Sequence, residues 1–429
     1  MRTIILQIVV LSISFIALFR PKIGLCGYLW YSLMRPDALA YTVANYFSLV
    51  LALSTLAGSL RYLGNAGRFA KSSLVLCFFV FQLFLGLSVV AAVDPRLCTS
   101  YSMFLRLSLM ALLIVLLTES LQDAKIYFLV MTGSMGLLGS KFGLFGLLHG
   151  GVRFAQGYGG GFLSDNNTLG LALAMTVPLC WYCRTMARSK GLSNFWTAIT
   201  LLDISAVVMT YSRGAALATG AAFLTIAFRS GKKMLAQLVL LGCLTAPAVY
   251  LVWDSYVNRI ESISNTQDTG RGRIYYWRAA LRMWQDHPIF GVGFGNDNYL
   301  ALISDYLGRD DPHVAHNTYI QMLVDSGICA FVVYMTLLGL TFRRMNRVAR
   351  NGNAIGNADQ ANMAYAIQAS LAAFLVGSIF LSRCSFDYLY LLIMLAAGLD
   401  LVAAVPEPVE GDALLAPPDL DAEPSGALS

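Results

Sequence analysis

Residues 73–93 read SLVLCFFVFQLFLGLSVVAAV, a run that contains no charged side chain. A helix needs about 20 consecutive apolar residues to cross the hydrocarbon core of a bilayer. Because the bilayer core offers no water to backbone amides, such a run crosses as a helix that satisfies its own hydrogen bonds. The stretch therefore predicts a membrane-spanning helix.

The whole chain repeats this pattern, with 57% hydrophobic residues and only 13% charged ones in 429 residues. A soluble domain has about 25% charged residues. We therefore predict an all-α polytopic membrane protein with about 12 transmembrane helices. The expected apolar segments are 3–19, 21–35, 41–58, 73–93, 102–118, 126–149, 167–186, 195–211, 213–228, 235–253, 317–341, 362–382 and 386–404.

Other classes fit the composition poorly. The net charge of +6 comes largely from Lys and Arg in short loops, without the basic stripe of a nucleic-acid-binding protein. The one CxxC pair, Cys180 and Cys183, has no second pair to complete a metal site, so the eight cysteines are interpreted as packing residues. The N-terminal run lacks a cleavage signal and is too long for a signal peptide, which predicts a retained first span.

Four basic loops predict the orientation in the membrane. They are RYLGNAGRFAK (61–71), RTMARSK (184–190), RSGKK (229–233) and RRMNRVAR (343–350). The positive-inside rule places all four in the cytoplasm. Counting back places the N-terminus outside, but one span fewer would place it inside. The short segment 21–35 could be half a hairpin or a broken helix, so both alternatives stay open.

The predicted organisation has four parts. Residues 1–253 form N-terminal transmembrane helices, 254–316 a large outer segment with short helices, 317–405 C-terminal transmembrane helices, and 406–429 a disordered cytoplasmic tail. The unusual polar residues converge on the outer face, where an ionisable group near membrane depth is a functional hypothesis by default.

Arg213 lies in the outer turn TYSRG (210–214), beside Tyr211. The planar guanidinium suits phosphate. The alternative is an arginine that reaches from a span end to the headgroups.

A second arginine cluster lies in the large outer segment. An amphipathic helix is expected from Ile274 to Trp284, with an apolar face of Ile274, Trp277, Leu281 and Trp284. Arg271 and Arg273 precede it, against the helix-dipole preference, which an anionic ligand would relieve. Binding to anionic lipid headgroups is the alternative. The following GVGFG (291–295) is expected to be a tight, flexible loop.

The stretch HVAHNTYIQ (313–321) contains two of the four histidines. His316, followed by Asn317, precedes an apolar span and could accept a proton from a hydroxyl group at neutral pH. A capping histidine is the structural alternative, and a metal site with His313 and Asp310 or Asp311 is a third. In FLSDNNT (162–168), at least one polar residue is expected to cap a helix.

These motifs together resemble the O-antigen ligase superfamily of ligases, polymerases and O-oligosaccharyltransferases. The resemblance rests on YSRGA (211–215), Arg273 four residues before Trp277, HPIFGVGFGNDNY (287–299) and HVAHNTYIQMLVDSGI (313–328). YSLMRPDALAY (31–41) and GGGFLSDNNTLGLALAMTVPL (159–179) are similar to a branch of O-glycosylation ligases associated with exosortase systems.

The resemblance implies a GT-C-like fold in the bacterial inner membrane and an inverting, metal-independent glycosyltransferase that needs no cofactor. The donor would be a glycan on undecaprenyl diphosphate, used on the periplasmic side. His316 would activate the acceptor hydroxyl group, and substrate-binding residues would be Arg213, Arg273, Arg271, His313, Tyr211, Asn317 and Arg153.

The acceptor stays open at this point. An O-antigen ligase acting on lipid A-core is the first choice; an O-linked protein glycosylation ligase and an O-antigen polymerase are alternatives. A secondary transporter or flippase would instead favour charges near mid-span and broken half-helices. A non-catalytic scaffold would give no reason for Arg213, Arg273 and His316 to share one side.

Overall fold

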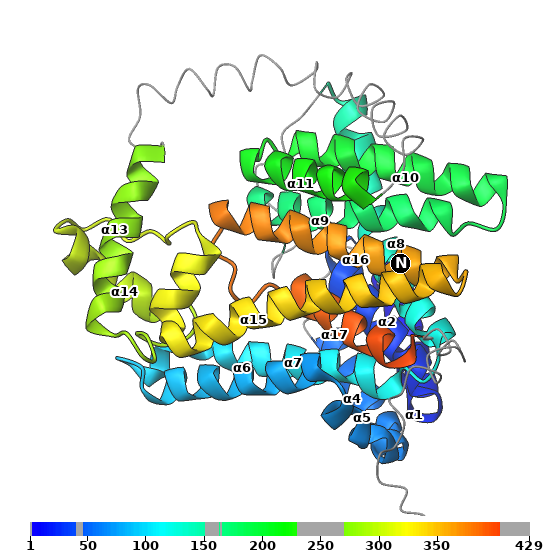
Figure 1. The fold of residues 1–429 in the computed structure, drawn as a ribbon, viewed down its shortest axis with the longest axis horizontal. Helices are drawn as coiled ribbons and strands as arrows, with labels where there is room; N and C mark the ends of the chain where they lie inside the picture. Colours follow the sequence, from blue (N-terminus) through cyan, green and yellow to red (C-terminus); the bar gives the residue numbers. More distant parts are fainter. Residues whose placement is uncertain (1, 40–45, 151–162, 164, 230–269, 404–429) are drawn as a thin grey trace, which may run out of the picture.

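The chain folds as an elongated helical bundle with a small helical unit at one end (Figure 1). The structure is a computed structural model that describes residues 2–39, 46–150, 163, 165–229 and 270–403. Its longer helices are α1 (Arg2–Phe19), α2 (Pro21–Met34), α4 (Tyr46–Ser59), α6 (Ser73–Val90), α7 (Thr99–Leu117), α8 (Leu121–Leu148), α9 (Asn166–Thr185), α10 (Lys190–Met209), α11 (Arg213–Arg229), α13 (Gly270–Asp286), α14 (Asp297–Leu307), α15 (Thr318–Ala354), α16 (Ala358–Gly377) and α17 (Asp387–Val402). The shorter ones are α3 (Pro36–Leu39), η1 (Leu60–Ala66), α5 (Gly67–Lys71), η2 (Pro95–Leu97) and η5 (Ser378–Phe380).

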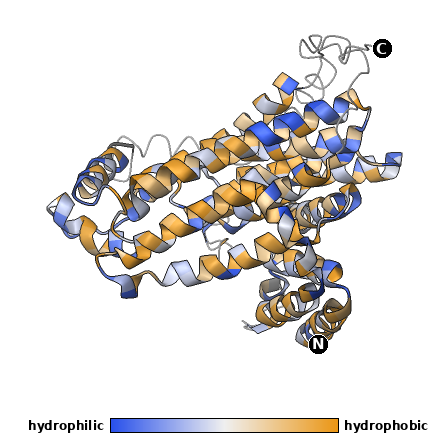
Figure 2. Cartoon of the chain, turned by 60° about the horizontal axis from the view of Figure 1, so that its bottom comes forward, coloured by the Kyte–Doolittle hydropathy of each residue, from blue (hydrophilic) through white to orange (hydrophobic). Residues whose placement is uncertain are grey.

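The predicted all-α membrane class is confirmed. Every expected apolar segment contains a helix except 235–253, which lies outside the described residues. Eight described helical stretches are long and apolar enough to cross a membrane: Arg2–Phe19, Tyr46–Lys71, Ser73–Val90, Thr99–Leu117, Leu121–Leu148, Lys190–Met209, Thr318–Ala354 and Ala358–Phe380. The count of about 12 spans stays a prediction. Figure 2 shows hydrophobic residues along the helices and hydrophilic ones gathered toward their ends.

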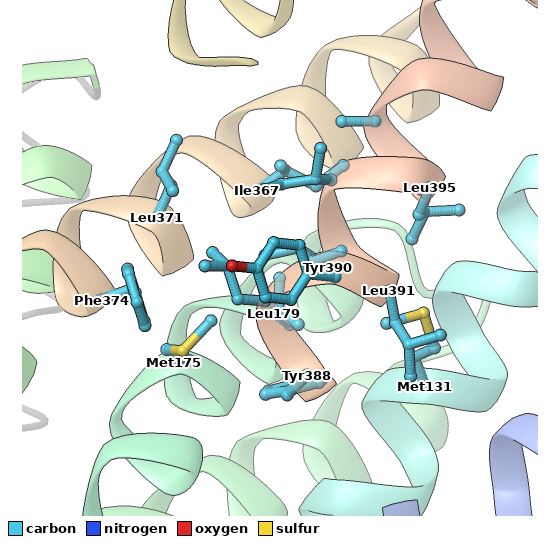
Figure 3. Close-up of a cluster of buried hydrophobic side chains, with 14 of the residues drawn as sticks. Met131, Met175, Leu179, Ile367, Leu371, Phe374, Tyr388, Tyr390, Leu391 and Leu395 are labelled. Atoms are coloured by element: carbon cyan, nitrogen blue, oxygen red, sulfur yellow. The ribbon is translucent and has the colours of Figure 1, made fainter. Parts of the chain in front are cut away.

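Helices α9 and α17 form the centre of the bundle. Almost every residue of α9, and every residue of α17 from Tyr388 to Leu399, is buried. Figure 3 shows Met175 and Leu179 of α9 in the same cluster as Tyr390 of α17 and residues of α8 and α16. Because protein surrounds α9 and α17 along most of their length, their composition need not satisfy the demands of a lipid-facing helix.

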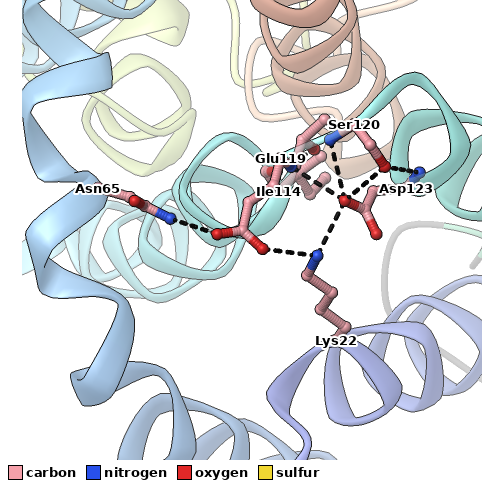
Figure 4. Close-up of polar contacts among 7 residues, drawn as sticks. Lys22, Asn65, Ile114, Glu119, Ser120 and Asp123 are labelled. Carbon is pink, nitrogen blue, oxygen red and sulfur yellow. Dashed lines mark hydrogen bonds and ion pairs between the residues drawn. The ribbon is translucent and has the colours of Figure 1, made fainter.

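The two ends of the bundle differ in charge. We call the end that carries loop 61–71 and the last turns of α15 the basic end. There Arg61 donates to the carbonyl oxygens of Leu18 and Phe19, 2.9 and 3.1 Å away, so α1 finishes at this end. Lys22, at the start of α2, forms ion pairs with Glu119 and Asp123 at 2.8 and 2.9 Å (Figure 4).

These contacts give the relative direction of α1 and α2, whereas the side of the N-terminus stays open. Since α1 finishes and α2 begins at the basic end, α1 and α2 run in opposite directions. We call the opposite end, where α13 and α14 lie (Figure 1), the outer end.

Candidate functional site at the outer end

The Arg213 turn is held by the start of α9. Helix α10 finishes at Met209 and α11 begins at Arg213. Between them Tyr211 is buried and left-handed, with a φ of 55°. Asn166 Nδ2 donates to the Thr210 carbonyl oxygen at 2.9 Å, which fixes the turn against α9. The Arg213 side chain is exposed. A cation at a helix N-terminus opposes the dipole, so an anion there would relieve the repulsion.

His316 lies immediately before α15, half-buried and with a left-handed φ of 49°. It does not cap the helix. Asn317 is the cap, because its Oδ1 accepts from the amides of Tyr319 and Ile320 at 3.0 and 3.1 Å. Asn317, placed among the substrate-binding residues by sequence, therefore has its side-chain oxygen engaged in capping.

One segment, residues 378–383, contacts both the Arg213 turn and the His316 region. A Cβ added to Gly214 would lie 3.1 Å from the Phe380 Cβ, so the turn packs on this segment. In the same segment, the Leu381 carbonyl oxygen accepts a hydrogen bond from Thr318 Oγ1. The Arg213 turn and the residues after His316 are thus attached to one shared support.

Arg383 completes that support. Its guanidinium forms an ion pair with Asp165 and donates to Thr168 Oγ1 at 2.9 Å. Its backbone amide donates to Thr318 Oγ1 at 3.1 Å. Asp165 also caps α9 as expected, because its side chain accepts from the amides of Asn167 and Thr168. The start of α9 therefore organises both halves of the site.

The electrostatics of Asp165 reflect these contacts. Burial raises the pKa of its carboxyl group, but the hydrogen bonds from Thr168 and the nearby Arg383 guanidinium outweigh this effect. The net result is a pKa below the ordinary value of an aspartate. Asp165 is therefore ionised at neutral pH.

The second arginine group is carried by α13, which lies across the outer end (Figure 1). Trp277 Nε1 donates to the Ala315 carbonyl oxygen at 2.7 Å, directly beside His316. Arg273 is half-buried one turn earlier on the same helix. Arg271 and Arg273 were expected to precede the helix, but α13 begins at Gly270 and includes both in its first turn.

The buried face of α13 is rotated from the expected one. Ala279, Ala280 and Met283 are buried, whereas Ile274 and Leu281 are 46% and 39% exposed. The pattern of large apolar residues was misleading because the small alanines allow α14 and α15 to approach closely on their side. Trp277 and Trp284 lie at the edge of the buried face. The prediction is therefore correct for the two tryptophans and wrong for Ile274 and Leu281.

His313 lies in an exposed polar cluster with α13. Its Nδ1 is 2.8 Å from Asp311 Oδ1 and 3.3 Å from the Tyr276 hydroxyl group. A hydrogen bond with Tyr276, then the charges of His313 and Arg309, lower the pKa of Asp311. The contact between Nδ1 and a carboxylate favours the tautomer that leaves Nε2 as an acceptor.

The alternative metal site does not assemble. In the described part of the chain, no three His, Cys, Asp or Glu side chains are grouped as a metal ion would require. His313 pairs with Asp311, and Asp310 instead accepts a hydrogen bond from Ser304 at 3.4 Å.

The GVGFG loop is tight, as expected, but it is held by backbone hydrogen bonds to α15, which corrects the expected flexibility. The amides of Val292 and Gly293 each donate at 2.9 Å to carbonyl oxygens of Val324 and Asp325. Gly327 has a φ of 72° and kinks α15 at this point. A Cβ on Gly327 would lie 2.1 Å from the Ile289 carbonyl oxygen, so the loop backbone occupies the space beside the kink.

Sequence reasoning missed Arg383 as a site residue. The available signal was its position in LSRCSFDY (381–388), one of the polar stretches on the predicted outer face. The side chain of Arg271, and Arg153 altogether, lie outside the described residues.

With this geometry in view, residues 198–335 match the family model for the O-antigen ligase domain. This match supports the O-antigen ligase superfamily. The match includes Arg213, Arg271, Arg273, His313 and His316, and Arg383 lies beyond it. The predicted superfamily is confirmed, whereas the exosortase-associated branch stays a prediction.

The matched domain supports a membrane glycosyltransferase of the O-antigen ligase or polymerase type, a family that implies a lipid-linked glycan donor and an acceptor in the membrane. No curated protein matches the chain. A solved chain from "Structural coordination of polymerization and crosslinking by a peptidoglycan synthase complex" is 16% identical, with a TM-score of 0.38. The alignment covers 77% of this chain and 96% of that chain, and at this score it carries no argument.

Proposed function

We propose that this O-antigen ligase superfamily member moves a glycan from undecaprenyl diphosphate to an acceptor hydroxyl group on the periplasmic side of the bacterial inner membrane. The first-choice acceptor is lipid A-core. The observation that carries the proposal is the shared support beneath Arg213 and His316, with Arg273 of α13 on the side of His316.

The arginines suit the donor. A lipid diphosphate presents its charge at the membrane surface, where guanidinium groups bind phosphate oxygens in pairs. Helices α9, α11, α15 and α17 all begin at the outer end, so their N-terminal dipoles add to the positive field of Arg213, Arg271 and Arg273. Stabilising the developing charge on the diphosphate is the main electrostatic task in such a transfer.

The chemistry balances as a single displacement. The acceptor oxygen attacks the anomeric carbon while His316 takes its proton. The bond from the anomeric carbon to the phosphate oxygen breaks, and undecaprenyl diphosphate leaves with the electron pair. One displacement inverts the anomeric configuration, and no step requires a metal ion.

The sidedness rests on the basic end. Loops 61–71 and 184–190 and the last turns of α15 carry its arginines and lysines, which the positive-inside rule assigns to the cytoplasm. The outer end then faces the periplasm. The transmembrane helices would then form two parts, residues 1–253 and 317–405. They would flank the periplasmic segment 254–316, and residues 406–429 would form a cytoplasmic tail.

A transfer assay tests the proposal. Purified protein in detergent receives undecaprenyl-diphosphate glycan with lipid A-core or a candidate acceptor protein, in the presence of EDTA. Product on lipid A-core supports the ligase, product on protein only supports the O-glycosylation ligase, and a lengthened donor glycan supports the polymerase. Absence of any product would overturn the enzyme proposal and favour a transporter.

His316→Ala should reduce kcat by about 100- to 10,000-fold, the contribution expected of a general base. His287→Ala is the matched control, because His287 is also half-buried in the outer segment but has no place in the proposed chemistry. Full activity of a folded His316→Ala variant would remove His316 from the role of base.

A further inference from the structure

The backbone around His316 is held by two buried side chains that do not belong to the proposed chemistry. His316 itself has a φ of 49°, a left-handed conformation that non-glycine residues adopt only when their surroundings enforce it. The residues on either side of it, Ala315 and Asn317, are both buried.

Gln321 forms the first half of the restraint. It is fully buried, and its Oε1 accepts from the Ala315 amide at 3.2 Å and from Ser382 Oγ at 3.3 Å. Its Nε2 donates to Asp325 Oδ1 at 2.8 Å. Two donors at one end of the amide and a carboxylate at the other fix which atom is oxygen.

Ser382 forms the second half. Its Oγ accepts from the Asn317 amide at 3.2 Å and donates to Gln321 Oε1. The amides before and after His316 are thus both tied to one glutamine, directly on one side and through a hydroxyl group on the other. We call this pair of side chains, Gln321 and Ser382, the amide clamp.

We propose that the amide clamp positions His316 for proton transfer, so that Gln321 and Ser382 are positioning residues of the reaction. This inference rests on the proposed role of His316. Removing Gln321 would leave two buried donors without their acceptor, and the loop would relax to satisfy them elsewhere. A displacement of about 1 Å in a reacting group can cost about 100-fold in rate.

Gln321→Leu keeps a side chain of similar volume and removes the hydrogen bonds of Gln321 to the Ala315 amide, Ser382 and Asp325, while the bond from the Asn317 amide to Ser382 stays. We expect kcat to fall about 100-fold while KM for the donor stays unchanged, because the arginines remain in place. Gln368→Leu is the matched control, since Gln368 is equally buried but donates to the Phe342 carbonyl oxygen in another part of the bundle.

Ser382→Ala provides a milder second variant. It should lower kcat about 10-fold, and Ser382→Thr, which restores a hydroxyl group, should recover most of the loss. Its control is Ser370→Ala, because Ser370 is also buried and its hydroxyl group has no described hydrogen-bond partner.

Amide hydrogen exchange supplies a measurement that does not depend on activity. The Ala315 amide, which loses its acceptor, should exchange at least about 10 times faster in Gln321→Leu than in Gln368→Leu. Equal amide exchange in Gln321→Leu and Gln368→Leu would overturn the amide clamp. An equal kcat in these two variants, or a Gln321→Leu variant in which only KM rises, would overturn it as well. A wild type inactive with every acceptor would overturn the proposed function, and the exchange result would still decide whether the clamp exists.

Discussion

Gly327 shows how much a single backbone position can determine. It has a φ of 72° and a ψ of 179° within α15, so the helix is interrupted there. The Ile328 amide donates to the Pro288 carbonyl oxygen at 2.9 Å, which ties the interruption to the loop that follows α13. Glycine adopts this left-handed φ without strain because it has no Cβ.

Gly327→Ala should therefore destabilise the protein by at least about 2 kcal/mol, through backbone strain and a clash with the Ile289 carbonyl oxygen. Thermal unfolding in detergent should show a Tm lower by about 5 °C. Gly339→Ala is the control on the same helix, where an added Cβ meets nothing within 4 Å. A Gly327→Ala variant as stable as Gly339→Ala would contradict the pinned loop.

At the scale of elements, the start of α9 joins parts of the chain that are distant in sequence. Asp165 caps its own helix and pairs with Arg383, while Asn166 holds the Thr210 carbonyl oxygen. Since α9 is buried along most of its length, its N-terminus is a fixed point on which the loops of the site are assembled.

The Asp165–Arg383 ion pair predicts a pH dependence. The folded-state pKa of Asp165 is lowered, so its stabilising effect is present above the unfolded value of about 3.9 and is lost as pH falls through the folded value. Asp165→Asn keeps a capping side chain but removes the charge. Wild type should have the higher Tm at pH 6 to 7, and the difference should vanish at about pH 2 to 3.

Comparing wild type with Asp165→Asn separates the effect of the ion pair from that of other acid-sensitive groups, because both proteins contain those groups. A Tm difference that is constant across the pH range would show that the Asp165 charge does not titrate with folding. No Tm difference at neutral pH would show that the pair adds nothing to stability.

At the scale of the whole molecule, charge and helix direction agree. Lys125 pairs with Asp359, and Arg347 pairs with Asp400 at 2.9 Å, so the starts of α8 and α16 and the finishing turns of α15 and α17 share the basic end. Asp165, Arg213, His316 and Arg383 all lie at the opposite end.

Labelling in intact cells tests this arrangement. Arg96→Cys should react with a membrane-impermeant maleimide applied from the periplasm, whereas Arg188→Cys should react only after the inner membrane is permeabilised. Arg96 and Arg188 are exposed and lie at opposite ends of the bundle. Wild type is the control, because its described cysteines are buried or half-buried. Labelling of Arg96→Cys only after permeabilisation would contradict the proposed sidedness.

The sequence by itself determined the fold class, the helix positions and the superfamily. Long uncharged runs such as 73–93 must become helices in a bilayer, because no other open structure satisfies the backbone there. Basic loops indicated the shared end, and the motifs around Arg213, Arg273 and His316 indicated the family that residues 198–335 confirm. These properties depend on local composition and spacing.

Only the tertiary structure decided the facing side of α13, the pinned GVGFG loop, the role of Arg383 and the amide clamp. Asp165 and Arg383 are 218 residues apart in sequence, and Asn317 and Ser382 are 65 apart. No local pattern reports such pairs, because their partners are chosen by how the helices pack. In particular, small residues such as Ala279 and Ala280 carry little hydropathy but permit the closest approach between helices, and that approach determines which side chains meet.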